Sequence, residues 1–403
     1  MGEKFSVDVE KLAGFGGGVE DVAGYLGKVQ ALVDAEAGPK DGWDGLMSQL
    51  KGPFEATRTK TSQRYDKRQI AMYMTGNELI SLANTYKEQE KKTGAKIRAA
   101  ASPLPGHDSR RDGDASTTAQ HVATGDMPDL AAPAHEQADV VSIVRDKAAW
   151  VADADEAIQK VSGWSPINDT FEKLVGNWAE LTRIGNVYEK AGKGMEGAGK
   201  SLESMTKQSK SHWDGKSAQA FEGYSEDLSK ALEAEAPLTK VIKDCLDVLV
   251  EQIKKLIKTI VDMVVEKLKK EVQIDNWKDA LKVLAKKIPI AGTAWQVERL
   301  AAILYEVFQE AQKLVDQVQK AVDLVKSVIE FFEDPAEYLK TKGEEKLNKA
   351  VDGALDKAGV ESAATKQLVK DLPAAVLAAP DYQAAPGDGY SGGAGGSPWE
   401  DGK

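Results

Sequence analysis

Few residues of this chain have the side-chain chemistry of a catalytic or metal site. The 403 residues include four histidines and one cysteine. His107, His121 and His135 follow one another at intervals of fourteen residues, in a stretch rich in Ala, Pro, Asp and Gly. Because a metal site needs ligands that converge on a fixed scaffold, we interpret this spacing as coincidental. The fourth histidine, His212, adjoins Trp213, and we expect it to pack in a turn or to face solvent.

The short motifs of common enzymes are also missing. The sequence has no glycine-rich phosphate loop, no Gly-x-Ser-x-Gly turn and no His-Glu-x-x-His pair. Asp and Glu are abundant, but they fall on the polar faces of predicted helices, where a solvated charge is the default interpretation. Long helical rods offer few of the concave pockets that catalysis needs. We therefore predict a non-enzymatic protein with no cofactor and no metal ion; an enzyme with an unrecognised motif is a third hypothesis.

Composition favours a helical protein. Apolar residues make up 42% of the chain and aromatic residues 6%, and Ala, Glu, Lys, Leu and Val dominate, which favours long helices over sheets. The formal net charge of −11 argues against a nucleic-acid binder, which normally has a basic surface. Between Lys240 and Lys287, twelve Lys stand against eight Asp and Glu. We interpret them as a solvated helix face, with a membrane surface or another anionic partner as the alternative.

No Sec-type signal and no membrane span are predicted. Residues Met1 to Ser6 have no basic region followed by an apolar core. The longest apolar candidate, Val241 to Leu268, is interrupted by charges such as Lys254 and Asp262, so it predicts an amphipathic helix. Cys245 lies within this helix, where we expect it to be buried as a small hydrophobic residue.

Residues 1–94 predict a helical hairpin. In its first arm, apolar residues recur at alternating steps of three and four, the heptad seam of a helix that packs against another helix: Leu12, Phe15, Val19, Val22, Leu26, Val29 and Val33. The stretch Ala37 to Gly42 is a helix stop and loop. The return arm begins near Leu46, and its apolar face comprises Leu46, Leu50, Phe54, Tyr65, Met72, Leu79 and Tyr86.

A second, longer hairpin is predicted over residues 139–275, after a flexible linker at 95–138 that has few large apolar residues. One heptad position of its long first arm holds Phe171, Trp178, Gly185, Gly192 and Gly199. Each glycine costs about 1 kcal/mol of helix propensity. We therefore predict that these glycines allow a partner helix to approach closely. The return arm runs from Ala218, with a kink expected at Pro237.

The remainder predicts a C-terminal helical extension at 276–377 and a disordered tail rich in Gly and Pro at 378–403. The predicted fold is all-α: an elongated helical bundle of two tandem hairpins, with additional long C-terminal helices. The sequence leaves open whether the two hairpins pack together within one chain or between chains.

The two predicted hairpin apices contain Trp43-Asp44-Gly45 and Trp213-Asp214-Gly215. Both resemble the Trp-x-Gly turn of the WXG100 family, the small proteins exported by type VII secretion. The family also has a Tyr-x-x-x-Asp/Glu export signal near the end of its return helix, and Tyr86 and Glu90 resemble it. Helical spacing places Tyr86 and Glu90 on one face, so we expect a receptor to read them together. The second hairpin has no such pair, since Leu228 follows Tyr224 at that spacing.

The second hairpin also contains Gly163-Trp164-Ser165-Pro166 and Gly176-Asn177-Trp178. With these features, residues 164–332 resemble the N-terminal domain of channel-forming, toxin-carrying proteins of mycobacteria and related actinobacteria. In those relatives a toxin follows this domain, whereas here only helix and a Gly-rich tail follow.

These resemblances imply a substrate of a type VII (ESX) secretion system, cytoplasmic before export and then secreted or held at the cell surface. The implied role is that of a structural or protein-interaction protein. Its expected partners are the secretion ATPase and either a WXG100-like protein or a second copy of itself, with no nucleic acid. The alternative is a membrane-active or pore-associated protein, in which Val241 to Leu268 contacts the membrane surface.

Overall fold

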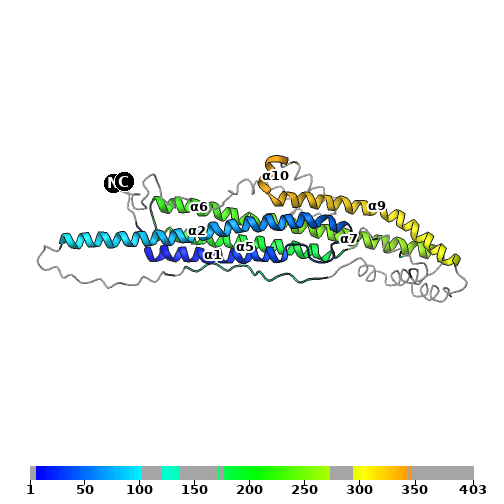
Figure 1. Cartoon of the computed structure of the whole chain (residues 1–403), viewed down its shortest axis with the longest axis horizontal. Helices are drawn as coiled ribbons and strands as arrows, with labels where there is room; N and C mark the ends of the chain where they lie inside the picture. The colour runs from blue at the N-terminus through cyan, green and yellow to red at the C-terminus, as the bar shows by residue number, and fades with distance from the viewer. Residues whose placement is uncertain are drawn as a thin grey trace.

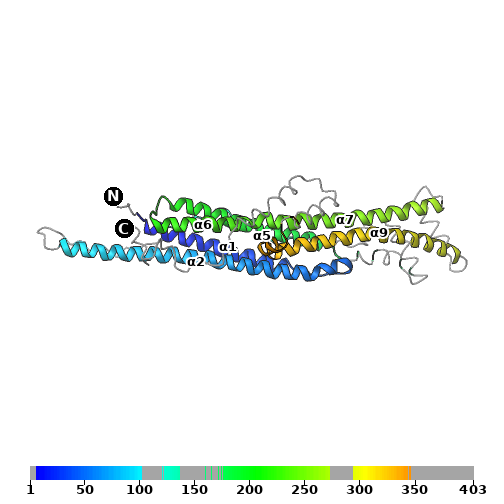
Figure 2. The same cartoon turned by 90° about the horizontal axis from the view of Figure 1, so that it is seen from above.

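The computed structural model describes residues 6–101, 120, 122–136, 176–272 and 294–343, and the single positions 159, 165, 171, 174 and 345. The described part consists of long helices that lie side by side along one axis (Figures 1 and 2). Its only β pairing is an isolated bridge between Val7 and Trp213. The prediction of an elongated all-α protein is confirmed.

The first hairpin consists of α1 (Val9–Glu36), the short helix η1 (Gly45–Met47) and α2 (Ser48–Ala101). Asp8 caps α1, since its side chain accepts a hydrogen bond from the backbone N–H of Lys11 at 3.1 Å. Every residue of the two seams listed above from the heptad pattern is at most 5% exposed. The gap between Phe54 and Tyr65 is filled by Thr57 and Thr61, which are fully buried.

The two helices of this hairpin approach closely at a pair of glycines. A Cβ on Gly16 would lie 2.8 Å from the carbonyl oxygen of Gly76, and a Cβ on Gly76 would lie 2.8 Å from that of Gly16. This crossing also defines the antiparallel register, because Gly16 faces Gly76 and Ile80. Since α2 is the longer helix, it projects beyond the start of α1, at the left of Figure 1.

The second hairpin consists of α5 (Ala179–Ser209), α6 (Lys216–Glu233) and α7 (Glu235–Val272). Its return arm breaks between α6 and α7 at Ala234, three residues before Pro237. A proline ring clashes with the carbonyl four residues earlier, here that of Glu233, and its nitrogen has no hydrogen to donate. Pro237 therefore falls in the first turn of a new helix.

The two hairpins lie antiparallel within one chain. The turn between α5 and α6 touches the start of α1, where the N–H of Asp8 donates to the carbonyl of His212 at 2.7 Å. At the other end, the N–H of Asn177, just before α5, donates to the carbonyl of Gly42 in the first hairpin's turn at 2.8 Å. Each apex thus lies against the beginning of the other hairpin.

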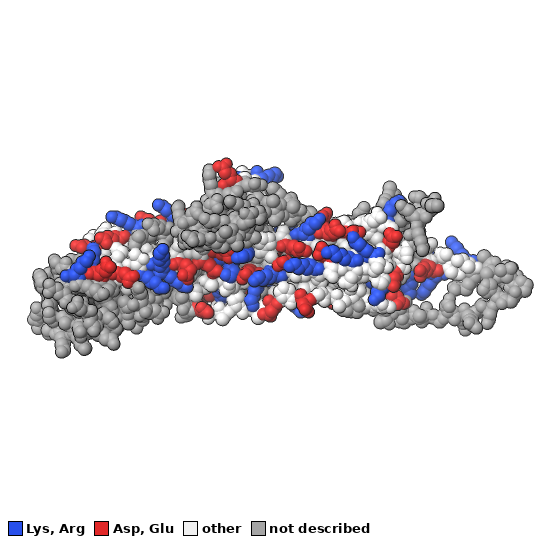
Figure 3. Space-filling view, turned by 180° about the vertical axis from the view of Figure 1, so that it is seen from behind, with Lys and Arg blue, Asp and Glu red and all other residues white. Residues whose placement is uncertain are grey.

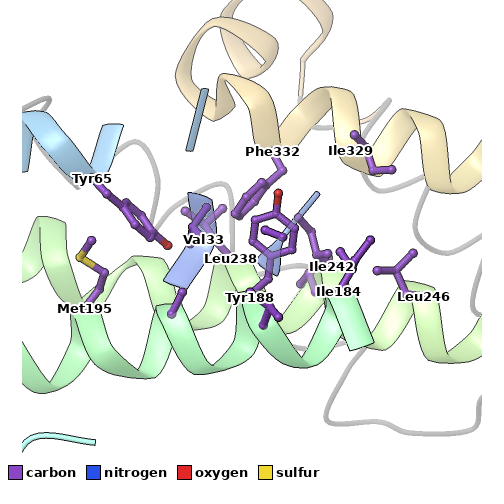
Figure 4. Close-up of a cluster of buried hydrophobic side chains, with 14 of the residues drawn as sticks. Val33, Tyr65, Ile184, Tyr188, Met195, Leu238, Ile242, Leu246, Ile329 and Phe332 are labelled. Carbon is purple, nitrogen blue, oxygen red and sulfur yellow. The ribbon is translucent and has the colours of Figure 1, made fainter. Parts of the chain in front are cut away.

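The C-terminal helices are part of the bundle rather than an appendage. Helix α9 (Ala294–Glu333) runs back along α7, and Lys267 of α7 pairs with Glu306 of α9 at 3.2 Å. Helix α9 ends in the middle of the molecule, where Phe332 meets the ring of Tyr188 edge-on with centroids 5.3 Å apart (Figure 4). A short helix, α10 (Pro335–Lys342), follows.

Part of the range predicted as a flexible linker, 95–138, is packed against the helices. Helix α2 continues to Ala101, and residues 122–136 lie extended along α1 and α5 (Figure 1). Val122 is 6% exposed, and the backbone carbonyl of Pro128 accepts a hydrogen bond from the hydroxyl of Tyr25 at 2.7 Å. The segment has few large side chains, but the helices beneath it carry glycines that let its backbone come close. We call residues 122–136 the strap.

Several predictions concern residues outside the described ranges. These are the tail at 378–403, most of the extension at 276–377 beyond Lys342, the start of the second hairpin near Trp164, and the sites of His107 and His121.

Candidate interaction sites at the ends and centre of the bundle

The Trp213 end of the bundle is a packed turn. Trp213 is 3% exposed, bridges to Val7 and packs against Phe221 with ring centroids 5.8 Å apart. Its indole Nε1 has no hydrogen-bond partner among the described residues. His212 lies beside Phe15, with ring centroids 6.2 Å apart, and its Nδ1 is 3.6 Å from the carboxylate of Asp8. His212 thus contributes to turn packing.

The Trp43 end is built in a similar way. Trp43 is 7% exposed and packs edge-on against Phe54 at 5.7 Å, and its Nε1 also has no partner among the described residues. Gly42 has φ +78°, and a Cβ there would meet the Cβ of Asn177 at 2.7 Å. The turn therefore requires glycine at position 42 both for its backbone conformation and for space.

The glycines of both Trp-x-Gly turns have positive φ. The angle is 51° at Gly45 and 111° at Gly215. L-residues with a side chain rarely adopt such conformations, so each glycine suits the reversal that follows its tryptophan.

Tyr86 and Glu90, the predicted export-signal residues, differ in exposure. Glu90 is exposed, whereas Tyr86 is 3% exposed and belongs to the hydrophobic core. The expectation that a receptor reads both side chains on one accessible face is therefore wrong for Tyr86. Gly16 of α1 lies opposite Gly76 of α2, and the two helices are antiparallel. Ten residues after Gly76, Tyr86 is therefore level with the start of α1. Tyr86 thus lies at the Trp213 end, and Glu90 lies on the projecting part of α2.

The glycine face of α5 lies against the return arm. A Cβ on Gly192 would be 1.9 Å from Oγ1 of Thr239 and 2.9 Å from the carbonyl oxygen of Glu235. A Cβ on Gly199 would be 2.8 Å from the carbonyl of Ser229, and one on Gly185 3.2 Å from Cα of Lys243. Trp178, the residue just before α5, is 1% exposed and donates from Nε1 to the carbonyl of Leu174 at 2.6 Å.

A buried group of charges at the centre of the bundle was not predicted from the sequence. It consists of Arg64 and Arg68 of α2 and Glu235 of α7, and we call it the central ion cluster. Oε1 of Glu235, a fully buried residue, lies 2.9 Å from Nε of Arg64 and 2.9 Å from a terminal nitrogen of Arg68. The hydroxyl of Tyr65 donates to the same carboxylate at 3.3 Å.

This cluster joins three parts of the chain. Arg68 also donates to the carbonyl of Ala231 at 2.6 Å, and the guanidinium of Arg64 lies 5.0 Å from the ring centroid of Phe332 in α9. Burial raises the pKa of Glu235, but the charges of Arg64 and Arg68 outweigh that effect and hold it below the ordinary value. No motif or spacing in the sequence singles out Arg64 or Arg68, because a charge on a long helix usually lies on its solvated face.

A second polar group surrounds Arg183 of α5 at the Trp43 end of the bundle. Arg183 is 2% exposed and donates to the carbonyls of Glu36 at 2.6 Å and Gly38 at 3.2 Å. These carbonyls lie at the C-terminal end of α1, where a cation is favourable. The carboxylate of Glu180, 2.9 Å away, balances the charge of Arg183. His135 joins this group through Glu180, at 3.2 Å.

The outer face shown in Figure 3 carries Lys and Arg interleaved with Asp and Glu. Along α5 this mixture is regular, with pairs Lys193–Glu189, Lys200–Glu196 and Lys207–Glu203 at 2.9, 2.5 and 2.8 Å. Within the described ranges, no helix has a segment apolar enough to cross a bilayer, and no group of three or more His, Cys, Asp or Glu is placed to hold a metal ion.

Comparison with known proteins finds a similarity in structure but none in sequence family. No family model matches the chain, and no curated protein does. The chain is similar to a solved structure, the crystal structure of EspB from the ESX-1 type VII secretion system, over 79% of this chain and 94% of that one. The sequence identity is 13% and the TM-score is 0.36.

Proposed function

We propose that this chain is a non-enzymatic substrate of a type VII secretion system that acts after export as a protein-interaction protein. The observation that carries the proposal is the reciprocal arrangement of the hairpins. Each Trp-x-Gly apex, at Trp43 and at Trp213, lies against the start of the other hairpin. One chain thereby forms the paired-hairpin bundle that its resemblance to the WXG100 family implies.

The projecting end of α2 is the surface that we assign to the export receptor, the secretion ATPase. It lies beyond the start of α1 and includes the exposed carboxylate of Glu90. Tyr86 is buried one turn earlier. We infer that Tyr86 anchors this part of α2 to the bundle and that Glu90 is the group in contact with the receptor.

A separate WXG100-like partner is unnecessary in this proposal. The apolar seams that such a partner would cover are already buried within the chain, as Val19 and Val22 of α1 and Tyr188 of α5 illustrate. After export, the interaction surface is the charged exterior, and we place the protein outside the cell or at its surface. A nucleic-acid partner does not suit a chain with a net charge of −11.

The membrane-active alternative depends on the apolar face of Val241 to Leu268. In the described part of that segment, this face is buried, including Ile253, Ile257 and Ile260 at 0–1% exposure. Membrane contact would require α7 to leave α5 and α9, which would expose this apolar surface to water first. We therefore prefer the protein-interaction role to the membrane-active one.

Export of matched variants from a host with the secretion system tests the proposal. Glu90→Gln removes one exposed charge and should leave folding unchanged but keep the protein in the cells. Glu88→Gln removes a neighbouring exposed charge outside the motif and should be exported normally. Tyr86→Phe keeps the buried ring and separates packing from the hydroxyl. Normal export of folded Glu90→Gln would refute our assignment of the receptor contact, and export that persists without the secretion ATPase would refute the pathway.

A further inference from the structure

The strap lies in a groove that is built for a polypeptide backbone. Glycines on two helices form its floor. A Cβ on Gly14 of α1 would lie 1.8 Å from the carbonyl oxygen of Gln120, and one on Gly18 would lie 3.0 Å from that of Val122. On α5, a Cβ on Gly197 would lie 2.6 Å from Cδ of Pro128. Larger side chains at these positions would displace the strap.

The walls of the groove bind the backbone of the strap at several points, and they also hold two of its side chains, His135 through Glu180 at 3.2 Å and Asp129 through Lys190 at 3.6 Å. Tyr25 donates to the carbonyl of Pro128 at 2.7 Å, and Lys190 donates to that of Ala131 at 2.6 Å. Asn177 donates through its side-chain amide to the carbonyl of Glu136 at 3.0 Å. Burial, together with the charge of Asp129, raises the pKa of Tyr25 to about 12, so its hydroxyl remains a donor at neutral pH.

Few side chains of the strap are anchored. Val122 is buried, Met127 and Leu130 are partly buried against the core, and most of the others are exposed. The strap makes no ladder of backbone hydrogen bonds to a neighbouring strand. Grooves that bind polyproline-type peptides also hold an extended, proline-containing segment, but they are lined by aromatic rings, whereas the floor here is glycine. What the two have in common is recognition of an extended backbone.

We propose that the groove between α1 and α5 is a binding site for an extended, proline-containing peptide, and that the strap, residues 122–136, occupies it as an intramolecular ligand. Because the contacts go mainly to backbone carbonyls, the site tolerates different sequences that keep small residues and two or three apolar anchors. In the intact chain, the tethered strap competes with any free peptide at a high effective concentration.

The experiment uses the full-length chain with residues 122–136 replaced by Gly and Ser at equal length. A fluorescent synthetic peptide of residues 120–136 should bind this variant and show a rise in anisotropy. Binding to the wild-type chain should be weaker, roughly tenfold or more, because the strap occupies the groove. A peptide with Asp at the positions of Val122, Met127 and Leu130 is the matched negative control.

A second substitution tests the groove itself. Gly197→Val in the strap-replaced chain should abolish peptide binding, whereas Gly24→Val on α1, where a Cβ meets no atom within 4 Å, should not. No binding by a helical, monodisperse strap-replaced chain would overturn the proposal. Equal binding by the wild-type chain would overturn the occupation of the groove by the strap.

Limited proteolysis covers the case in which the strap-replaced chain does not fold. In the wild-type chain, residues 120–136 should resist cleavage, and Gly197→Val should make the same segment sensitive while α1 and α5 remain intact. Cleavage of the strap at the same rate in both proteins would show that the groove does not hold it, and would refute the proposal.

Discussion

The carboxylate of Glu235 lies 2.9 Å from Nε of Arg64, although the two residues are 171 positions apart in the chain. Both belong to helices that pack in the middle of the bundle, and the Glu235 side chain is completely shielded from water. The pair joins α2 of the first hairpin to α7 of the second. The relative position of the hairpins therefore depends on a specific charge contact as well as on apolar packing.

Removal of that carboxylate should be strongly destabilising. Glu235→Gln leaves Arg64 and Arg68 without their shared counterion, and loss of one partner of a buried pair costs about 3–5 kcal/mol. The matched control is Glu226→Gln, which removes an exposed carboxylate from α6 and should change stability by less than about 0.5 kcal/mol. Urea denaturation followed by circular dichroism measures both. Similar midpoints for the two variants would contradict a stabilising role for the cluster.

The same contact predicts a dependence on pH. Because the arginines hold the pKa of Glu235 below its ordinary value, the folded state favours the ionised carboxylate. Its contribution is complete above the unfolded pKa of about 4.3 and is lost as the pH falls below that value toward the lowered folded pKa.

The stability difference between wild type and Glu235→Gln should therefore be constant from pH 5.5 to 8 and shrink below about pH 4.3. Denaturation curves at pH 7, 5, 4 and 3 provide the comparison, and other carboxylates cancel because both proteins have them. A difference that grows in acid would show that the buried carboxyl is protonated in the native state.

Two glycines in helices should respond to alanine with opposite signs. Gly192→Ala places a methyl group against Thr239 and the backbone of Glu235, and overpacking of about 1–3 kcal/mol exceeds the gain in helix propensity of about 1 kcal/mol. At Gly223 of α6 a Cβ meets no atom within 4 Å, so Gly223→Ala should stabilise the protein by about 0.5–1 kcal/mol. Thermal melting decides the signs. Stabilisation by Gly192→Ala would mean that α5 and α7 are further apart than described.

Loss of the Trp213 indole should loosen the end of the bundle where the two hairpins meet. Trp213→Ala removes a ring that is 3% exposed and should cost about 3–5 kcal/mol. Tyr73→Ala removes a ring that is 54% exposed and should cost far less. Amide hydrogen exchange provides a local readout, because the N–H groups of Asp8 and Asp214 are bonded across this junction. Unchanged protection of both amides in Trp213→Ala would exclude a role for the indole in holding it.

The heptad pattern was sufficient to predict the helices and their seams, because burial repeats with the period of the helix. Steps of seven from Tyr65 through Met72 and Leu79 reach Tyr86, and all four side chains are buried. The same pattern shows why Tyr86 could not be an exposed recognition residue. The Tyr-x-x-x-Glu motif predicted an exposed Tyr86, whereas the heptad position of Tyr86 predicted a buried one. The side chain is buried.

The strap and the central ion cluster could not be predicted in the same way. Composition described the strap correctly as poor in large apolar residues, but its binding depends on glycines of other helices, such as Gly14 and Gly197. On its own helix, neither Arg64 nor Glu235 differs from an ordinary surface charge. The two form a buried pair only when the hairpins pack together. Both features arise from contacts between segments that are far apart in the sequence, which local periodicity does not report.

The antiparallel docking of the hairpins also sets the order in which the protein is able to fold during synthesis. The first hairpin is complete when the ribosome has added Ala101, but its partner surface on α5, α6 and α7 ends only at Val272. At about 5–20 residues per second, the intervening chain takes roughly 10–35 s to make. Until α5 is complete at Ser209, the side of α1 that later meets it lacks this partner. Slower translation between the hairpins lengthens the time for which this apolar surface is open to aggregation.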